Sequence, residues 1–171
     1  MNYILSKEIA YRKLQRMAYE IVERNIDEKQ IILAGIKESG VIIARILHDY
    51  LKEIFKGEII LPEISIDKRD PKNISISQQI DFENKVVIIT DDVSNSGKTL
   101  MYALKPFLDF YPKKIQTLAL VERSHREFPV SPDYVGMSVA TALSQKIVVE
   151  TENGEILGAY IQWLKYQPFS F

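Results

Sequence analysis

Apolar side chains recur at two different spacings along this chain, and the alternation between the two spacings predicts its elements. Leu14, Met17 and Ile21 follow one another at helical spacing. Ser6 before them is a favourable N-cap, and the pattern stops at Asn25. We therefore expect an amphipathic helix that begins after Ser6 and ends near Asn25.

The same spacing predicts two more helices. Ile43, Leu47 and Leu51 lie on one face of the first of them. The second begins within residues 94–99 and continues to about residue 110. Each is flanked by short apolar runs, so helical and strand patterns alternate along the sequence.

Short apolar runs, too brief for helices, predict strands at residues 30–34, 58–66, 85–90 and 115–121. The run KVVIIT at 85–90 is the clearest buried strand of the four. Residues 146–150 and 155–160 are typical of a hairpin, with Asn153 and Gly154 at its turn.

Strands that alternate with crossover helices are typical of an α/β fold, in which a parallel sheet is covered by helices on both faces. No repeat, low-complexity tract or linker divides the sequence, so we expect a single domain over residues 1–171. Sheets of this kind bind ligands in the loops at the carboxyl ends of their strands.

Four segments between the predicted elements are polar enough to be loops. Residues 67–80 contain Pro71 and show little periodicity, which predicts a mobile loop. Residues 123–141 form a second excursion that contains prolines. The loops at 35–40 and 91–99 follow predicted strands directly, so they are the candidates for ligand binding.

The second of these loops, TDDVSNSGKT, ends like a P-loop but lacks its opening residue. A Walker A motif needs a glycine five positions before its final Gly-Lys pair, and Asp92 stands at that position, which argues against a nucleoside triphosphatase. The loop instead combines hydroxyls, a flexible glycine and the start of a helix, a combination suited to enclosing one phosphate group. The residues concerned are Ser94, Asn95, Ser96, Gly97, Lys98 and Thr99.

Two adjacent carboxylates, Asp91 and Asp92, end the predicted strand before this phosphate cradle. Carboxylates accept hydrogen bonds from a sugar diol and hold hydrated Mg²⁺, whereas they repel a polyphosphate. A ligand with a phosphate at one end and a diol at the other is a ribose 5-phosphate. The alternative is that the two aspartates cap the helix and the loop is only a turn.

Several segments of the chain resemble one known family. TDDVSNSGKTL is similar to the phosphoribosyl-pyrophosphate (PRPP) signature of type I phosphoribosyltransferases. GIKESG resembles the GIKTRG loop of the PyrR family, whose members are pyrimidine-operon regulators and uracil phosphoribosyltransferases. LVERSHREFPVSPDYVG resembles that family's LVDRGHRELPIRADYIG, and LQRMAYEIVERN resembles its LTRIAHEMIERN. The resemblance covers about residues 4–150 and implies the parallel-sheet phosphoribosyltransferase fold with a small hood.

The resemblance also implies catalytic and substrate-binding roles. Asp91 and Asp92 would hold the ribose hydroxyls and Mg²⁺ through water, and Arg69 would stabilise the departing pyrophosphate. Residues 94–99 would bind the 5-phosphate. Residues 67–80 would form a flexible lid that keeps water from the ribosyl intermediate.

A second loop and a hood complete the site that the resemblance implies. Residues 123–146 would form the hood that shapes the base pocket, with Arg123 among the substrate-binding residues. The pyrophosphate loop, which in this family often contains a strained non-proline cis peptide, would consist of Lys37, Glu38, Ser39 and Gly40.

Three departures from the family pattern bear on function. Glu38 and Ser39 replace a threonine and an arginine, which adds a negative charge beside the pyrophosphate if Glu38 points inward. Asn95 stands where purine salvage enzymes carry an aspartate, and an asparagine is no general base, which disfavours hypoxanthine and guanine. The expected reaction is therefore transfer of ribose 5-phosphate from PRPP to a pyrimidine, uracil first. The alternative is a catalytically weak nucleotide or PRPP sensor that controls RNA or a protein partner.

Composition narrows the partners. The net charge is −1, from 22 Lys and Arg against 23 Asp and Glu, so no overall basic excess exists to attract RNA. Gln15, Tyr19 and Met137 also differ from the regulators' Thr, His and Lys, although Arg16 and Arg24 match. RNA is therefore disfavoured as a partner.

The remaining composition concerns location and assembly. Zero cysteines exclude thiol catalysis and cysteine-ligated metals. We expect no signal peptide, no membrane span and a cytoplasmic protein, since no long apolar run occurs.

The aromatic residues of the last twelve positions favour burial in the domain or in a homo-oligomer interface. They are Tyr160, Trp163, Tyr166, Phe169 and Phe171.

Overall fold

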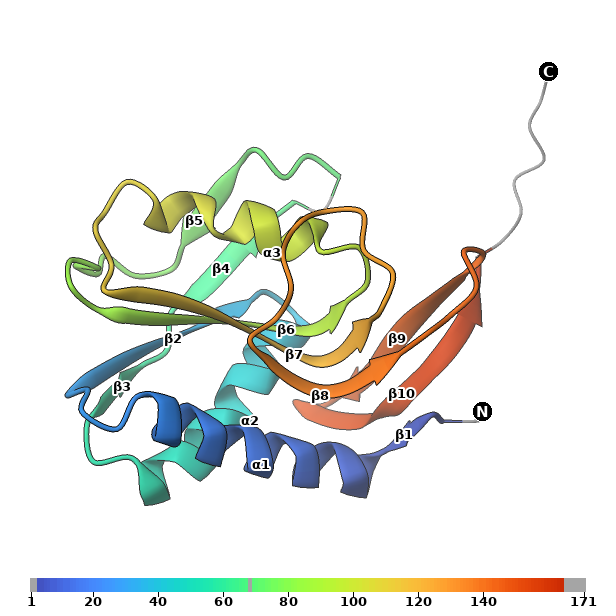
Figure 1. The fold of residues 1–171 in the computed structure, drawn as a ribbon, viewed down its shortest axis with the longest axis horizontal. Helices are drawn as coiled ribbons and strands as arrows, with labels where there is room; N and C mark the ends of the chain where they lie inside the picture. The colour runs from blue at the N-terminus through green and yellow to red at the C-terminus, as the bar shows by residue number, and fades with distance from the viewer. Residues whose placement is uncertain (1–2, 68, 165–171) are drawn as a thin grey trace.

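The main sheet confirms the predicted parallel α/β architecture. The structure is a computed structural model that describes residues 3–67 and 69–164. Within that part of the chain the main sheet has seven strands, parallel except for one edge pair, β4–β5 (Figure 1). In spatial order they are β5 (Ile74–Ile76), β4 (Glu63–Ile66), β2 (Gln30–Ile36), β6 (Val86–Ser94), β7 (Lys114–Arg123) and β8 (Tyr134–Val139), with β3 (Glu58–Ile60) also paired to β2.

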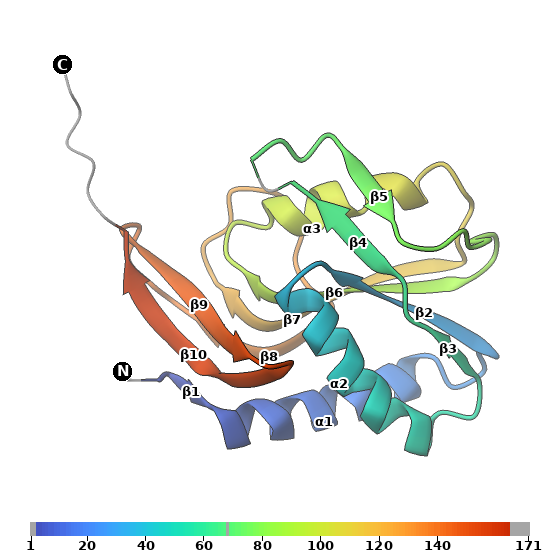
Figure 2. The same ribbon diagram turned by 180° about the vertical axis from the view of Figure 1, so that it is seen from behind.

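Helices cover both faces of this sheet, as predicted. Helices α1 (Lys7–Arg24) and α2 (Ser39–Ile54) lie on one face. Helix α3 (Lys98–Ala103) and the 3₁₀ helix η1 (Lys105–Phe107) lie on the other, which Figure 2 shows from behind. Successive strand residues point to opposite faces, so Ile31 and Leu33 pack toward α1 and α2 while Ile32 and Ala34 pack toward α3.

Helix α1 has the predicted ends. The side chain of Ser6 accepts a hydrogen bond from the backbone N–H of Ile9, and Asn25 is the C-cap. The Asn25 amide Nδ2 donates to the Ile21 carbonyl and to Gln116 of β7, and the Tyr134 hydroxyl of β8 also donates to Gln116. This buried network fixes the end of α1 to the two strands.

Proline explains two differences from the predicted elements. The expected strand at 58–66 is divided into β3 and β4, because Pro62 between them has no N–H to donate to the ladder. The helix expected to reach residue 110 ends as α3 at Ala103 and continues only as η1, which contains Pro106.

Two short strands were missed because neither has a clear period. The predicted mobile loop at 67–80 contains β5, which pairs antiparallel with β4. The excursion at 123–141 contains β8, which lies parallel to β7 at the sheet edge. Tertiary pairing decides both segments, since their sequences are too polar or too short to predict a strand.

The predicted closing hairpin exists but belongs to a second sheet. Strands β9 (Gln145–Glu152) and β10 (Glu155–Trp163) join at Asn153 and Gly154, which both have positive φ, 52° and 79°. With β1 (Leu5–Ser6) they form a sheet in the order β1-β10-β9. Figure 1 shows that the carboxyl ends of β6 and β7 point toward this small sheet.

Of the aromatic residues near the C-terminus, Trp163 is largely exposed, whereas Tyr166, Phe169 and Phe171 lie outside the described residues.

In the part of the chain that the structure describes, no helix has the length and apolar character that crossing a membrane requires.

Candidate functional site

The acidic pair lies inside β6 rather than after it. The strand extends to Ser94 because β7 continues to pair with it, with Val93 opposite Val121 and Ser94 opposite Glu122. Asp91 Oδ1 accepts the Asp92 N–H at 2.9 Å, and Asp92 Oδ1 accepts the Val93 N–H at 2.8 Å. The strand thus holds both carboxylates at the carboxyl edge of the sheet.

The alternative role of the acidic pair, as a helix cap, is wrong. Helix α3 begins at Lys98, and its N-cap is Gly97, with φ of 81° and no side-chain capping bond. Asp91 and Asp92 lie six and five residues before that cap, and each accepts a hydrogen bond from the N–H of the next residue in the strand. Capping therefore does not explain two carboxylates at this position.

The predicted phosphate cradle is held in place by residues 127–130, a segment distant in sequence. The Ser96 carbonyl accepts the N–H groups of Glu127 and Phe128, at 3.1 and 3.0 Å. Gly97 approaches this segment so closely that an added Cβ would lie 2.9 Å from the Val130 carbonyl oxygen. A side chain at position 97 would need both a strained φ and more room, so the sequence requires glycine there.

Ser94 places a buried hydroxyl without a hydrogen-bond partner beside the acidic pair. The residue is only 3% exposed, and its Oγ has no hydrogen-bond partner within the described structure. Buried hydroxyls are rarely left without a partner, because an unmade bond costs about 1–3 kcal/mol. Ser94 is one of the residues that line a cavity, and its hydroxyl could donate a hydrogen bond to a phosphate oxygen there.

Asn95 does not point its amide at the cavity as a free group. Its Nδ2 donates to the Ile147 carbonyl at 3.2 Å, and its Oδ1 accepts the Ile147 N–H at 3.1 Å. The side chain therefore joins the cradle to β9, although the sequence placed Asn95 among the substrate-binding residues.

The first cavity has a volume of about 250 Å³ and lies between the cradle and the small sheet. Its β9 wall was missed by sequence reasoning, since a hairpin prediction does not say where the hairpin packs. The lining residues are Asp91, Asp92, Val93, Ser94, Asn95, Ser96, Gly97, Thr99, Leu100, Lys146, Ile147, Val148 and Val149. Seven of the predicted site residues are thus brought together here, and Lys98 is not among the lining residues.

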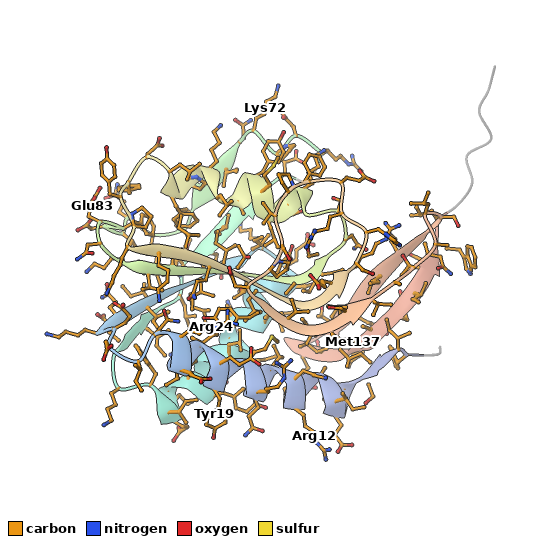
Figure 3. The ribbon with its side chains drawn as sticks, in the orientation of Figure 1. Arg12, Tyr19, Arg24, Lys72, Glu83 and Met137 are labelled. Atoms are coloured by element: carbon orange, nitrogen blue, oxygen red, sulfur yellow. The ribbon has the colours of Figure 1, made fainter. Side chains whose placement is uncertain are left out.

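A second cavity, of about 730 Å³, combines the predicted pyrophosphate loop with the predicted lid. Lys37 and Glu38 of the loop line it together with Arg69. Asp67 and Lys72 also line it and were not singled out from the sequence. Figure 3 shows Lys72 on the α3 side of the sheet. Three cations and two carboxylates therefore share this cavity.

Glu38 has an unusual backbone. Its φ of 72° and ψ of −116° are costly for a residue with a side chain, and it is the N-cap of α2 without a side-chain capping bond. All peptide bonds among the described residues are trans, so the cis peptide that the resemblance implies is not observed. Glu38 is exposed and lines the second cavity.

Gly40 acts through packing rather than by lining a cavity. The Thr90 hydroxyl donates to the Gly40 carbonyl at 2.9 Å, and a Cβ at position 40 would lie 2.6 Å from the Thr90 carbonyl oxygen. Ser39 and Gly40 form the first turn of α2, which this contact holds against β6 beside Asp91. The two predicted ligand loops are thereby brought to one edge of the sheet.

Arg123 lies at the end of β7, at the start of the predicted hood, and lines neither cavity. Its guanidinium Nη2 donates to the Ala142 carbonyl at 3.2 Å, which ties β7 to the turn before β9. A quarter of the predicted hood at 123–146 is β8 of the main sheet (residues 134–139), whereas residues 146–149 form the wall of the first cavity.

The carboxylates of this edge suit a hydrated cation carried in with a substrate. The described residues contain no cluster of three or more His, Cys, Asp or Glu that could enclose a metal ion. Mg²⁺ commonly uses one or two carboxylates, with water and substrate phosphate as its other ligands. Asp91 and Asp92 provide oxygen donors of that kind.

Comparison with known proteins agrees with this fold. Residues 2–153 match the phosphoribosyl transferase domain family, and the chain belongs to that family. Among its curated relatives are proteins named bifunctional protein PyrR. The one from Haemophilus ducreyi is 35% identical over 88% of this chain and 89% of its own, and one from Enterococcus faecalis is 37% identical over 82% and 84%.

Solved structures agree on the fold. The hypoxanthine phosphoribosyltransferase of Trypanosoma cruzi matches with a TM-score of 0.77 at 16% identity, over 92% of this chain and 95% of its own. A hypoxanthine-guanine phosphoribosyltransferase from Bacillus anthracis matches with a TM-score of 0.75 at 17% identity, over 94% and 97%.

Proposed function

We propose that this protein transfers ribose 5-phosphate from PRPP to a pyrimidine base, uracil first, and releases pyrophosphate. In this reaction the bond between ribose C1 and a pyrophosphate oxygen breaks, and its electron pair leaves with pyrophosphate. N1 of uracil forms the new bond to C1 and loses its proton, which gives UMP. Family membership supports the reaction class, and the two cavities support the division of the substrate between them.

The observation that carries the proposal is the unpartnered, buried hydroxyl of Ser94 beside the two aspartates. In the proposed complex the 5-phosphate lies in the cradle of Ser94, Ser96 and Thr99, and accepts hydrogen bonds from hydroxyl and backbone N–H groups. Asp91 and Asp92 accept hydrogen bonds from the ribose hydroxyls. No strongly basic surface is required, which agrees with a net charge of −1.

Asp91 and Asp92 would also hold Mg²⁺ through water. Bound there, Mg²⁺ would neutralise charge on the pyrophosphate and make it a better leaving group. Lys37, Arg69 and Lys72 of the second cavity would bind the pyrophosphate itself. The 67–80 segment would close over the substrates and exclude water from the ribosyl intermediate.

A pyrimidine is preferred because Asn95 stands where purine salvage enzymes carry an aspartate, and an amide is no general base for a purine. Its Oδ1 and Nδ2 are bonded to the N–H and the carbonyl of Ile147. Over their aligned lengths, the relatives named PyrR share more of this chain's sequence, 35% and 37%, than the two purine enzymes do, at 17% and 16%.

A direct test separates catalysis from binding. Isothermal titration calorimetry with PRPP and Mg²⁺ measures binding, and radiolabelled uracil measures turnover. We expect binding and the appearance of UMP. Turnover of hypoxanthine but not of uracil would contradict the pyrimidine assignment, and absence of both binding and turnover would contradict the site.

A second candidate function is a sensor that binds PRPP or a nucleotide without efficient turnover. It is favoured by Glu38, which places a carboxylate at the cavity proposed for pyrophosphate. In the same assays, PRPP or UMP binding without formation of UMP from uracil would support the sensor.

RNA is a weaker candidate for the sensor's partner. Arg16 and Arg24, the matching basic residues on α1, are already used within the protein. Arg16 pairs with Glu20 and donates to the Val135 carbonyl, while Arg24 donates to the Asp133 carbonyl and lies 4.7 Å from the ring centre of Tyr134. Figure 3 shows Arg24 on the side of α1 that faces the sheet and Tyr19 on the opposite side.

Location and assembly complete the proposal. We propose that the protein is cytoplasmic and that it forms a homo-oligomer. Exposed apolar side chains such as Trp163 favour burial between subunits, which supports the oligomer. Light scattering after size-exclusion chromatography tests this, and a molar mass of one chain at micromolar concentration would contradict it.

A further inference from the structure

The small sheet and the phosphate cradle are joined by one side chain. Asn95 pairs with the N–H and the carbonyl of Ile147, as a neighbouring strand would. On its other edge β9 pairs with β10, where Ile147 is opposite Ile161. On the edge of β9 that faces away from β10, the N–H and the carbonyl of Ile147 are therefore paired with an amide of the cradle.

The chemistry of this contact requires an amide. The asparagine side chain has one carbonyl acceptor and one NH₂ donor, and both are needed to pair with a peptide unit in this geometry. Ile147 is 2% exposed, so its N–H and carbonyl have little water to replace a lost partner. An aspartate keeps the acceptor but places a charged oxygen against the Ile147 carbonyl.

The position of the contact gives it a functional consequence. On one side Asn95 is part of the cradle, between Ser94 and Ser96, and on the other side Ile147 is part of the wall formed by residues 146–149. Both line the same cavity of about 250 Å³. A shift of the cradle would therefore move the wall that would face the base through this contact.

We infer that Asn95 is a positioning residue that couples the phosphate half of the site to the base half. It acts through Ile147, since its amide nitrogen and oxygen bond the carbonyl and the N–H of that residue. The inference rests on the proposed function and deepens it. Coupling of this kind makes a nucleotide bind more tightly than its separate parts suggest.

The test compares two ligands that share the phosphate and differ in the base. Ribose 5-phosphate and UMP are titrated calorimetrically into the full chain, its Asn95→Ala variant and its Asn95→Asp variant. We expect both variants to bind UMP at least tenfold more weakly. We expect Asn95→Ala, which adds no charge and leaves the cradle hydroxyls and N–H groups unchanged, to bind ribose 5-phosphate within about threefold of the unsubstituted protein. The charge of Asn95→Asp weakens both ligands, and its extra loss for UMP reports the coupling.

Gln162→Ala is the matched control. Gln162 is an exposed residue of β10 that lies opposite Lys146 and lines neither cavity, so its loss leaves both affinities unchanged. Circular dichroism melting of all variants shows whether each is folded at the titration temperature. If Asn95→Ala does not fold, Asn95→Asp, which keeps the shape and one of the two hydrogen bonds, supplies the comparison.

Two results overturn the inference. Unchanged UMP affinity in both variants shows that the Ile147 contact does not position the wall. Equal losses of UMP and ribose 5-phosphate affinity show that Asn95 only keeps the cradle folded. A failure of the unsubstituted protein to bind either ligand contradicts the proposed function itself, and the coupling with it.

Discussion

At the scale of single residues, the described part of the candidate site contains one buried group without a hydrogen-bond partner and one residue with a strained backbone. The Ser94 hydroxyl is buried without a partner, and the backbone of Glu38 is held at a φ of 72°. Buried unpaired groups and strained backbones both cost free energy, and they persist where function retains them. The residue-scale predictions concern the two ends of the proposed substrate.

Asp91→Asn and Thr99→Ala each weaken PRPP binding at least tenfold, which corresponds to about 1.4 kcal/mol or more. Asp91→Asn removes the charge that would bind Mg²⁺, and Thr99→Ala removes a hydroxyl of the cradle. Calorimetry with PRPP and Mg²⁺ measures both. If both variants bind PRPP as the unsubstituted protein does, the site has been placed wrongly.

Glu38→Gln strengthens the binding of pyrophosphate by about two- to fivefold, because it removes an exposed negative charge from the second cavity. The measurement is calorimetry with pyrophosphate and Mg²⁺ at low salt. Glu53→Gln, on the same helix α2 but outside both cavities, is the control. Weaker pyrophosphate binding by Glu38→Gln would show that the carboxylate assists the ligand.

At the scale of elements, the site exists because a helix approaches a strand closely. Gly40 in the first turn of α2 leaves room for the Thr90 carbonyl of β6, and this contact brings the two loops to one edge. Neither element carries the complete site. The geometry belongs to the pair of elements.

Gly40→Ala lowers the free energy of unfolding by about 1–3 kcal/mol, because the added Cβ would lie 2.6 Å from a backbone oxygen that cannot rotate away. Urea unfolding followed by circular dichroism measures the change, and PRPP affinity is expected to fall with it. Ser39→Ala, one position earlier in the helix, is the control and changes stability little. Wild-type stability in Gly40→Ala would mean that α2 shifts away from β6 without cost.

At the scale of the whole molecule, a buried polar network joins the end of α1 to strands β7 and β8 of the main sheet. Tyr134 is fully buried, and burial raises the pKa of its phenol above the ordinary 10.0 despite hydrogen bonds with Asn25 and Gln116. Below pH 10 the phenol is neutral in the folded and the unfolded chain, so its contribution to stability is fully present. Above pH 10 the unfolded chain ionises first, and stability falls as the pH rises toward the folded-state pKa.

The protein therefore loses more stability between pH 9 and about pH 11 than its Tyr134→Phe variant does. Urea unfolding at both pH values measures the two losses, and each protein serves as its own reference at pH 9. The variant is less stable at pH 9 because Gln116 loses the hydroxyl as a donor. Equal losses in the two proteins would show that the Tyr134 phenol does not resist ionisation.

Much of this molecule was determined by local sequence. Ser6 and Asn25 set the ends of α1 through capping, and the buried runs at 30–34 and 85–90 specify the two central strands. The Asn153–Gly154 turn set the final hairpin, because positive φ is cheap for those two residues. The motif residues of the cradle are adjacent in sequence, so their proximity was certain.

Only the tertiary structure decided which distant segments meet. Residues 146–149 form the wall of the cavity, and the 127–130 segment supports the cradle. The amide of Asn95 forms hydrogen bonds with Ile147. These contacts depend on how the small sheet packs against the end of the main sheet, and apolar packing is not directional enough for a local pattern to specify it. The sequence alone thus specified the chemical groups of the site, while packing determined which of them face the cavity.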